Sequence, residues 1–200
     1  MKLQKIITLN EKKFSDLGID NIDGRIVCAS KNLTSLEGAP SIVNGSFDCS
    51  SNQLVNLLGA PNKITGHFYC GNNRLTSLEG GPSYVGDGYF CYDNELVTLK
   101  GAPQHVEYGF ECDHNKLTSL KDIHRYIQKI GGDFGCFYNP IKSHILGLTL
   151  IDIGGYICTQ LGDGKDVDII LNKWKNQGRK GVMGAMKELT DLGYEELAQL

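Results

Sequence analysis

The sequence lacks several features that would assign it to a common functional class. Its 20 Lys and Arg residues nearly balance 23 Asp and Glu residues, which leaves a formal net charge of −3. So small a charge gives no general attraction for nucleic acid or for an anionic membrane. No apolar run is long enough to cross a bilayer, and residues 1–10 are too polar for a signal peptide. We therefore expect a chain that binds no nucleic acid, spans no membrane and works in the cytoplasm.

Catalytic motifs are missing as well. The sequence contains no Gly-rich phosphate loop, no nucleophile elbow and no pair of carboxylates on a defined framework. The five histidines are scattered, and His114 would point to the opposite strand face from its neighbour Asp113. We therefore expect a protein that is not an enzyme and that needs no cofactor or metal.

What the sequence does have is cysteine at a fixed spacing. Five of its seven cysteines are 21 residues apart and a sixth follows after 24, at Cys28, Cys49, Cys70, Cys91, Cys112 and Cys136. Such a period is typical of a solenoid, in which one small unit stacks on copies of itself. The spacing does not resemble the paired C-x-x-C of a zinc site. Metal or disulfide chemistry is one interpretation, and small buried hydrophobic side chains are the one that we favour.

Each unit repeats the same residue types around its cysteine, roughly F-x-C-x-x-N-x-L-x-x-L-x-G-x-P-x-x-V. The alternation of the aromatic residue and cysteine places both side chains on one face of a short strand. Strands from successive units then pair in parallel. With proline in a unit of 21 residues, no helix of several turns fits on the return side. The repeat predicts one parallel sheet of about seven short strands, with extended or 3₁₀ returns.

The last units depart from the repeat. An insertion around residues 123–129 predicts a helical turn in the fifth return. The run Tyr156-Ile-Cys158 predicts a seventh strand, with Cys158 in the cysteine position and Leu161 where asparagine is expected.

The chain ends are expected to cap the stack, because a solenoid otherwise exposes its terminal apolar coils. We expect an N-terminal cap over residues 1–24, the solenoid over 25–163 and a helical cap over 164–200. The candidate apolar residues of the first cap are Ile6, Ile7, Leu9, Phe14, Leu17 and Ile19.

The C-terminal segment predicts two helices. Val167, Ile170, Leu171 and Trp174 recur at helical spacing after Asp166, a plausible N-cap. A Gly-Arg-Lys-Gly turn over residues 178–181 and a second helix ending at Gly193 follow. A DNA-binding helix–turn–helix is one interpretation, but two basic residues make a poor phosphate contact surface. We favour a hairpin that buries Trp174 and Met186 on the last strand.

The repeat resembles a known family. The run from Phe47 to Leu54, F-D-C-S-S-N-Q-L, resembles the L-x-L-x-x-N-x-L core of leucine-rich repeats, with Phe and Cys in the first two Leu positions. Together with the L-x-G-x-P tail, and with the closing segment after residue 169, it is similar to small leucine-rich-repeat-like proteins encoded by tailed bacteriophages. The resemblance covers residues 26–200 and implies a repeat solenoid, a leucine-rich-repeat-like right-handed coil. For a phage-encoded factor it implies the host cytoplasm as the location.

Strand positions facing away from the core predict a binding surface. On the expected concave face the middle is aromatic and the C-terminal side is acidic, and exposed aromatic residues flanked by charge are typical of interface hot spots. An ordinary solvated sheet, with aromatic residues chosen for strand propensity, is the alternative. The candidate site residues are Asp48, His67, Tyr69, Phe90, Tyr92, Asp93, Glu111, Asp113 and Phe137.

These residues favour a monomeric protein-binding module that captures a host or defence protein bearing Lys or Arg. A second hypothesis is a binder of a small nucleotide signal, which would stack its base on Tyr69, Phe90 and Tyr92. It is disfavoured because the nearby acidic charge would repel phosphate. A structural or virion-associated component is the third.

Overall fold

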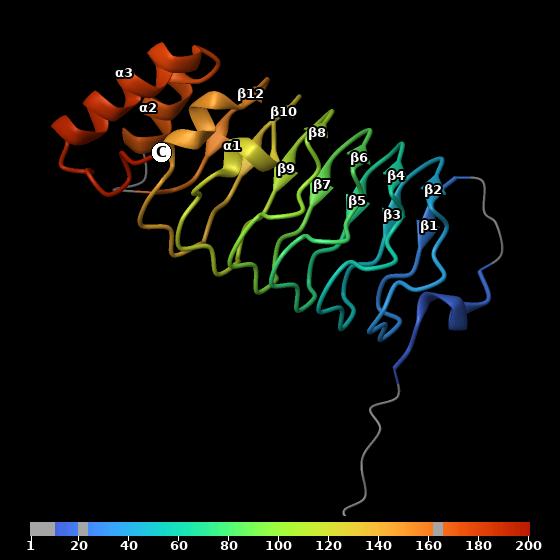
Figure 1. Ribbon diagram of the computed structural model, residues 1–200. Helices are drawn as coiled ribbons and strands as arrows, with labels where there is room; N and C mark the ends of the chain where they lie inside the picture. Colours follow the sequence, from blue (N-terminus) through green and yellow to red (C-terminus); the bar gives the residue numbers. More distant parts are fainter. Residues whose placement is uncertain (1–10, 20–23, 162–165) are drawn as a thin grey trace, which may run out of the picture.

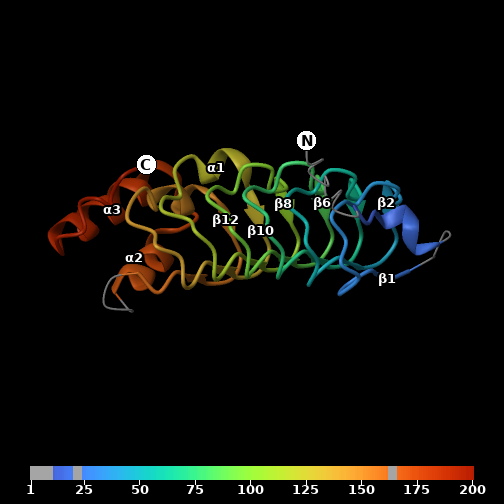
Figure 2. The ribbon, with the colours of Figure 1, turned by 90° about the horizontal axis from the view of Figure 1, so that it is seen from below.

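The chain folds into an elongated stack of short coils with helices at one end (Figure 1; Figure 2). The structure, a computed structural model, describes residues 11–19, 24–161 and 166–200. Two parallel sheets run along the stack, one of seven strands and one of six, and consecutive coils contribute neighbouring strands to each. We number the coils one to seven along the seven-stranded sheet. The repeat solenoid predicted from the cysteine spacing is confirmed.

Each strand is two residues long. The seven-stranded sheet contains β1 (Ile26–Val27), β3 (Phe47–Asp48), β5 (Phe68–Tyr69), β7 (Tyr89–Phe90), β9 (Phe110–Glu111), β11 (Phe134–Gly135) and β13 (Ile157–Cys158). The six-stranded sheet contains β2 (Ile42–Val43), β4 (Lys63–Ile64), β6 (Tyr84–Val85), β8 (His105–Val106), β10 (Lys129–Ile130) and β12 (Asp152–Ile153). The expected sheet and extended returns are confirmed, and the pairing of the returns into a second sheet is an addition.

Identical residue types stack in buried columns between the two sheets. One column is aromatic, with successive ring centroids 5.0 to 6.2 Å apart, and consists of Phe14, Phe47, Phe68, Tyr89, Phe110 and Phe134. The cysteine column beside it is buried, and all seven cysteines of the chain are free thiols. Burial raises the pKa of the Cys28 thiol to about 12 and raises the pKa values of Cys49 and Cys112 well above that of a free thiol. These thiols therefore stay protonated and pack as small apolar groups.

A ladder of asparagines holds each coil to the preceding one. Asn94 Nδ2 lies within hydrogen-bonding distance of three carbonyl oxygens, those of Cys70, Cys91 and Tyr92. Its Oδ1 accepts a hydrogen bond from the Leu75 backbone N–H at 3.1 Å. The same arrangement recurs at Asn52, Asn73, Asn115 and Asn139. The asparagine at the corner of the repeat therefore satisfies backbone groups of two coils at once.

The glycine of the repeat allows close contact between coils. Gly101 has a φ of +90°, and a Cβ there would lie 2.3 Å from the Glu79 backbone nitrogen. Only glycine fits so close to the preceding coil with a left-handed backbone.

One coil carries a matched pair of exceptions in the core. Tyr89 occupies a position that is Phe in its neighbours, and Gly81 occupies the position held by Ala39, Ala60 and Ala102. A Cβ on Gly81 would lie 3.1 Å from the Tyr89 hydroxyl oxygen. That hydroxyl is buried without a hydrogen-bond partner of normal geometry in the described part of the chain. The Cys70 thiol beside it is at best a weak partner.

We predict that Tyr89→Phe raises the free energy of unfolding by about 1 kcal/mol, because it removes a buried polar group that lacks a strong partner. Gly81→Ala alone should destabilise the protein. The double variant carries the Ala and Phe found in the neighbouring coils and should be more stable than Gly81→Ala. Urea unfolding of the four members of this double-mutant cycle measures the coupling. A destabilising Tyr89→Phe, or additive effects, would contradict the pairing.

The N-terminal end is covered by a short 3₁₀-helix, η1 (Phe14–Leu17). Phe14 is buried and stacks on Phe47 at 6.0 Å, so it extends the aromatic column beyond coil one. Leu17 and Ile19 pack against the core while partly exposed. The other predicted cap residues, Ile6, Ile7 and Leu9, lie outside the described residues.

Two returns near the C-terminal end contain helical turns. The predicted turn in the fifth return is confirmed as α1 (Ile123–Tyr126), which buries Ile123. A second turn, the 3₁₀-helix η2 (Leu146–Leu150), was not expected. It packs against the C-terminal helices α2 (Asp166–Trp174) and α3 (Gly178–Asp191).

Helix α2 lies at the C-terminal end of the stack (Figure 1). Side-chain amides of α2 and of the residues that follow it close the open sheet edges. Asn172 accepts a hydrogen bond from the Ile157 N–H at 2.9 Å and donates to the Ile157 carbonyl at 2.7 Å. Asn176 does the same for Ile153, at 3.0 and 2.9 Å. Asp168 accepts from the Thr159 backbone and hydroxyl. These polar residues replace the backbone of a next coil for strands β12 and β13, which otherwise present unpaired edges.

Three details of the C-terminal prediction are wrong. Helix α3 begins at Gly178, so the residues expected as a Gly-Arg-Lys-Gly turn form its first turn. Met186 is exposed rather than buried, because the face of α3 that packs inward carries Val182, Ala185 and Leu189. Cys158 pairs with Gly135, so Thr159 takes the buried position expected for Cys158.

Candidate functional site

The outward residues of the seven-stranded sheet form three columns, which we call the seven-strand face. The middle column contains Val27, Asp48, Tyr69, Phe90, Glu111, Gly135 and Cys158, as the strand register shows. Two residues earlier on each coil lie Arg25, Ser46, His67, Gly88, Gly109, Asp133 and Tyr156. Two residues later lie Ala29, Ser50, Gly71, Tyr92, Asp113, Phe137 and Gln160. The expected concave face corresponds to this surface.

Aromatic rings gather on coils three and four. The Tyr69 and Phe90 rings stack with centroids 4.9 Å apart and planes 10° from parallel. The His67 ring lies 5.6 Å from Tyr69 and 5.7 Å from Phe90. His67 Nδ1 accepts a hydrogen bond from the Gly88 N–H at 3.0 Å. Three of the predicted residues therefore form one aromatic cluster, held in place by a backbone hydrogen bond.

Glycines leave room for two rings of this face. A Cβ on Gly88 would lie 2.6 Å from the Phe90 ring, and one on Gly71 would lie 2.9 Å from the Tyr92 ring. The Phe90 ring therefore lies against Gly88 of its own coil and the Tyr92 ring against Gly71 of the preceding coil, where a larger residue would displace them. Tyr69, Phe90 and Tyr92 are each partly exposed, which leaves ring surface open to a partner.

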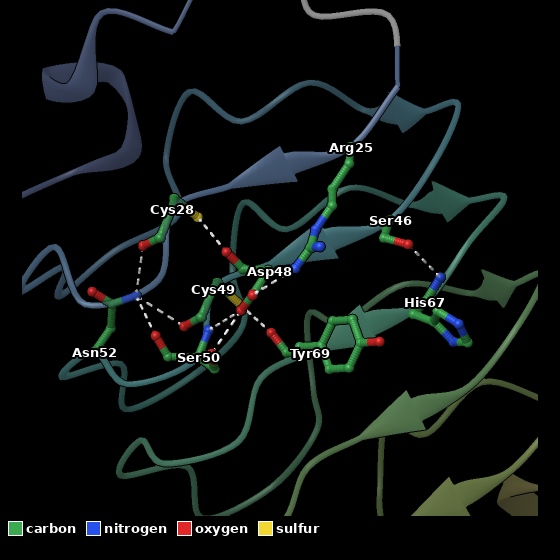
Figure 3. Close-up of polar contacts among 9 residues, drawn as sticks. All are labelled: Arg25, Cys28, Ser46, Asp48, Cys49, Ser50, Asn52, His67 and Tyr69. Atoms are coloured by element: carbon green, nitrogen blue, oxygen red, sulfur yellow. Dashed lines mark hydrogen bonds and ion pairs between the residues drawn. The ribbon is translucent and has the colours of Figure 1, made fainter.

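On the N-terminal side of the rings, Asp48 already has partners (Figure 3). Its carboxylate accepts hydrogen bonds from the Ser50 hydroxyl at 2.6 Å and the Ser50 N–H at 3.1 Å. Arg25 forms an ion pair with it at 3.4 Å. Asp48 is therefore a satisfied group that orders coils one and two.

On the C-terminal side of the rings, the carboxylates of Glu111, Asp113 and Asp133 lie close together. Asp113 accepts a hydrogen bond from the Phe137 N–H at 2.6 Å, and Asp133 accepts one from the Tyr156 N–H at 2.7 Å. No Lys, Arg or His among the described residues forms an ion pair with these two or with Glu111. Gly135 lies between Glu111 and Asp113, where a Cβ would be 3.3 Å from Asp113 Oδ1.

Burial disfavours the charged forms of Glu111 and Asp113, and repulsion from the neighbouring carboxylates adds to this effect at Glu111. Burial, and then the charges of Asp113 and Asp133, raise the pKa of Glu111. Burial also raises the pKa of Asp113, against the opposing effect of the Phe137 N–H hydrogen bond. Burial and the nearby carboxylates raise the pKa of the Tyr92 hydroxyl. The negative charge of the face therefore lowers the free energy of unfolding, and such a loss of stability is common at functional surfaces.

We predict that Glu111→Gln combined with Asp113→Asn raises stability at pH 7. The pKa values of both carboxyl groups are higher in the folded protein than in the unfolded chain. The ionised carboxylates therefore destabilise the fold at a pH above the folded pKa values, and this effect disappears at a pH below the unfolded pKa of about 4. The gain of the double variant should shrink as the pH falls towards 4. Urea unfolding at pH 7 and pH 4 measures this, and a double variant less stable than wild type at pH 7 would contradict it.

The structure brings together most, not all, of the predicted site residues. Asp93 lies at the corner after the strand, in a left-handed conformation with a φ of 51°, so its side chain is outside the three columns. Phe137 lies beside Gly135 at the acidic end. Asp133 and Cys158, which also lie on the face, were not among the candidates. Counting back three residues from Cys136 would have found Asp133, whereas Cys158 depends on the shifted register of β13.

Cys158 differs from the six cysteines of the buried column because it is partly exposed on the seven-strand face. Burial and the charge of Asp168 raise its pKa, so the thiol is protonated at neutral pH. Because Cys158 is partly exposed, its thiol offers a position for chemical labelling at the C-terminal end of the face.

Comparison with known proteins gives no relative. No protein-family model, no curated protein and no solved structure matches the chain. No group of three or more His, Cys, Asp or Glu in the described residues could hold a metal ion. Within those residues, no helix has the length and apolar character needed to cross a membrane.

Proposed function

We propose that the protein is a non-enzymatic protein-binding module that uses the seven-strand face. The observation that carries this proposal is the aromatic cluster of coils three and four, which lies next to the unpaired carboxylates of coils five and six. Partly exposed aromatic residues at the centre of a surface, with charge beside them, are the usual composition of a protein-binding hot spot. The rigid solenoid keeps these groups in fixed positions, which lowers the entropic cost of binding.

The resemblance of the repeat to small phage-encoded proteins extends the proposal to the setting. The protein then acts in the cytoplasm of an infected cell as a monomer, and its partner is a host or defence protein with a basic surface. Charge complementarity supports a basic partner, because Glu111, Asp113 and Asp133 form no ion pair with a Lys, Arg or His among the described residues.

A capture experiment tests the face as the binding site. Wild-type protein and the Tyr69→Ser/Phe90→Ser/Tyr92→Ser variant are immobilised, bacterial lysate is passed over both, and retained proteins and small molecules are identified by mass spectrometry. The control is Ile42→Ser/Tyr84→Ser, which removes two exposed apolar side chains on strands β2 and β6 of the six-stranded sheet. The proposal expects a protein held by wild type and the control and lost from the first variant. Equal retention by all three would contradict it.

A second candidate is a small-ligand binder that stacks a nucleobase on the flat Tyr69 and Phe90 rings. The parallel ring pair favours it, and the unpaired carboxylates one coil away oppose a phosphate-bearing ligand. Thermal-shift measurements across cyclic nucleotides test it, and no change in melting temperature would remove it.

A further inference from the structure

We infer that the partner's anchor on the seven-strand face is an arginine side chain, seated where the aromatic cluster meets the carboxylates. This inference rests on the proposed function, since it names the chemistry by which that face recognises its partner. It is carried by three features of coils four to six: an aromatic surface, unused carboxylate oxygens next to it, and glycines that place no side chain between them.

The aromatic surface and the carboxylates are direct neighbours. Phe90 and Glu111 are paired residues in the register of β7 and β9. Parallel strands in a sheet are about 4.8 Å apart, so a planar group lying on the Phe90 ring reaches the Glu111 carboxylate. A guanidinium group combines these two contacts, because it stacks on aromatic faces and donates N–H groups in its own plane.

The number of free acceptors suits a donor with several N–H groups. Both oxygens of Glu111 lack a hydrogen-bond donor among the described residues, and so does one oxygen each of Asp113 and Asp133. The guanidinium offers five N–H donors in a fixed fork, which matches carboxylates two bonds at a time. An ammonium group carries the same charge, but it is more strongly hydrated and matches carboxylates only as a point charge.

Two glycines keep larger side chains away from Glu111. Gly109 precedes Glu111 on coil five, and the nearest heavy atom to a Cβ there would be the Asp133 carbonyl oxygen at 3.4 Å. Gly135 occupies the middle column between Glu111 and the partly exposed Cys158. Both glycines are buried and add no side chain beside Glu111, while the neighbouring middle-column residues Tyr69 and Phe90 carry large rings.

The same residues predict how binding depends on pH. The partner's cation interacts with the ionised forms of Glu111 and Asp113, whose pKa values are raised in the free protein mainly by burial. Binding should therefore lower those pKa values, and affinity should fall on acidification from pH 7 towards 5. Among the other ionisable groups around the site, Asp93 and His114 lie near Asp113, and Asp87 lies 3.9 Å from His67 beside the aromatic cluster.

The probes for a test are three capped tripeptides, Gly-Arg-Gly, Gly-Lys-Gly and Gly-citrulline-Gly. They are titrated at pH 7 into the ¹⁵N-labelled full-length protein, and amide chemical shifts are followed. The inference expects the arginine peptide to shift the amides of Phe90, Glu111, Asp113 and Gly135, with at least threefold tighter binding than the lysine peptide. The citrulline peptide, which is planar but uncharged, should leave them unchanged.

Variants of the protein show which side chains contact the arginine peptide. Glu111→Gln combined with Asp113→Asn should weaken the arginine peptide at least tenfold, and Phe90→Leu should reduce its preference over the lysine peptide to about one. The matched control, Asp152→Asn combined with Asp191→Asn, makes the same change in charge away from the face and should bind as wild type does. The amide spectrum of each free variant reports its folding in the same experiment.

The outcomes separate this inference from the proposed function. If the arginine peptide causes no shifts, or binds no better than the lysine peptide, the arginine inference is overturned, whatever the capture experiment retains. If the control variant weakens binding as much as the carboxylate variant, the attraction is only general charge and the inference is overturned too. The aromatic triple variant in the capture experiment decides the proposed function independently.

Discussion

Asn94→Leu should lower the free energy of unfolding by about 4 kcal/mol. Leucine is close in volume but removes the amide that serves three carbonyls and one N–H of coils three and four. Each buried backbone group left without a partner costs about 1–3 kcal/mol, and some of these groups will find water instead. Urea unfolding followed by circular dichroism measures the loss.

Amide hydrogen exchange shows which coils Asn94→Leu destabilises. The Leu75 N–H, which donates to Asn94 Oδ1, should lose protection, while amides of coils one and six change little, because a solenoid is stabilised mainly between neighbouring coils. The control is Asn62→Leu, at an exposed asparagine on the surface of the stack. A loss from Asn94→Leu no larger than that from Asn62→Leu would contradict the role given to the ladder.

The second large effect that we expect comes from removing the amides of Asn172 on α2 and of Asn176 just after that helix. Asn172→Ala combined with Asn176→Ala should lower the free energy of unfolding by about 3 kcal/mol and cause the protein to associate. The substitutions leave the N–H and carbonyl groups of Ile153 and Ile157 unpaired at the ends of the two sheets. Unpaired strand edges cost hydrogen bonds and pair readily with other chains.

Urea unfolding and sedimentation velocity, at several protein concentrations, measure the two consequences. Lys173→Ala is the control, since Lys173 lies between the two asparagines in the sequence and makes an exposed ion pair with Glu188, and exposed ion pairs add little to stability. A double variant that stays monomeric with wild-type stability would show that α2 packs on the stack without closing its edges.

The sequence was sufficient to predict the stack because each coil repeats its buried residues. The spacing of cysteine, aromatic residue and asparagine determines the register, and the structure follows it from coil one to coil six. The second sheet was harder to foresee, since each of its strands offers only one buried Val or Ile. The outward residue changes from Ile42 to Lys63 to Tyr84, so no strand pattern repeats there.

The errors arise where the repeat ends. The register of β13 is shifted by one residue relative to its cysteine, which no residue in the run Tyr156-Ile-Cys158 indicates. Met186 was expected in the core because it is apolar, yet the smaller Ala185 occupies the inward position of α3. Capping by Asn172 and Asn176 could not be predicted without knowing which strand groups lie opposite them.

The aromatic and acidic residues of the seven-strand face followed from the strand alternation. Their surroundings did not, because they depend on contacts between coils. Gly88 belongs to the same coil as Phe90, yet Gly71 makes room for a ring that comes from the following coil. The partners of Asp48 and the lack of any described partner for Glu111 also emerge only when coils are placed side by side.

Cross-linking from the face is the most direct test of its role. Cys158, the partly exposed cysteine, is labelled with a maleimide photocrosslinker, and the labelled protein is irradiated in bacterial lysate. In the comparison protein Cys158→Ser is combined with Asp152→Cys, which moves the label to the six-stranded sheet. We predict a cross-linked protein from Cys158 that disappears when Tyr69, Phe90 and Tyr92 are changed to serine and is absent with the label at position 152. Equal cross-linking from both positions would contradict the assignment of the seven-strand face as the binding surface.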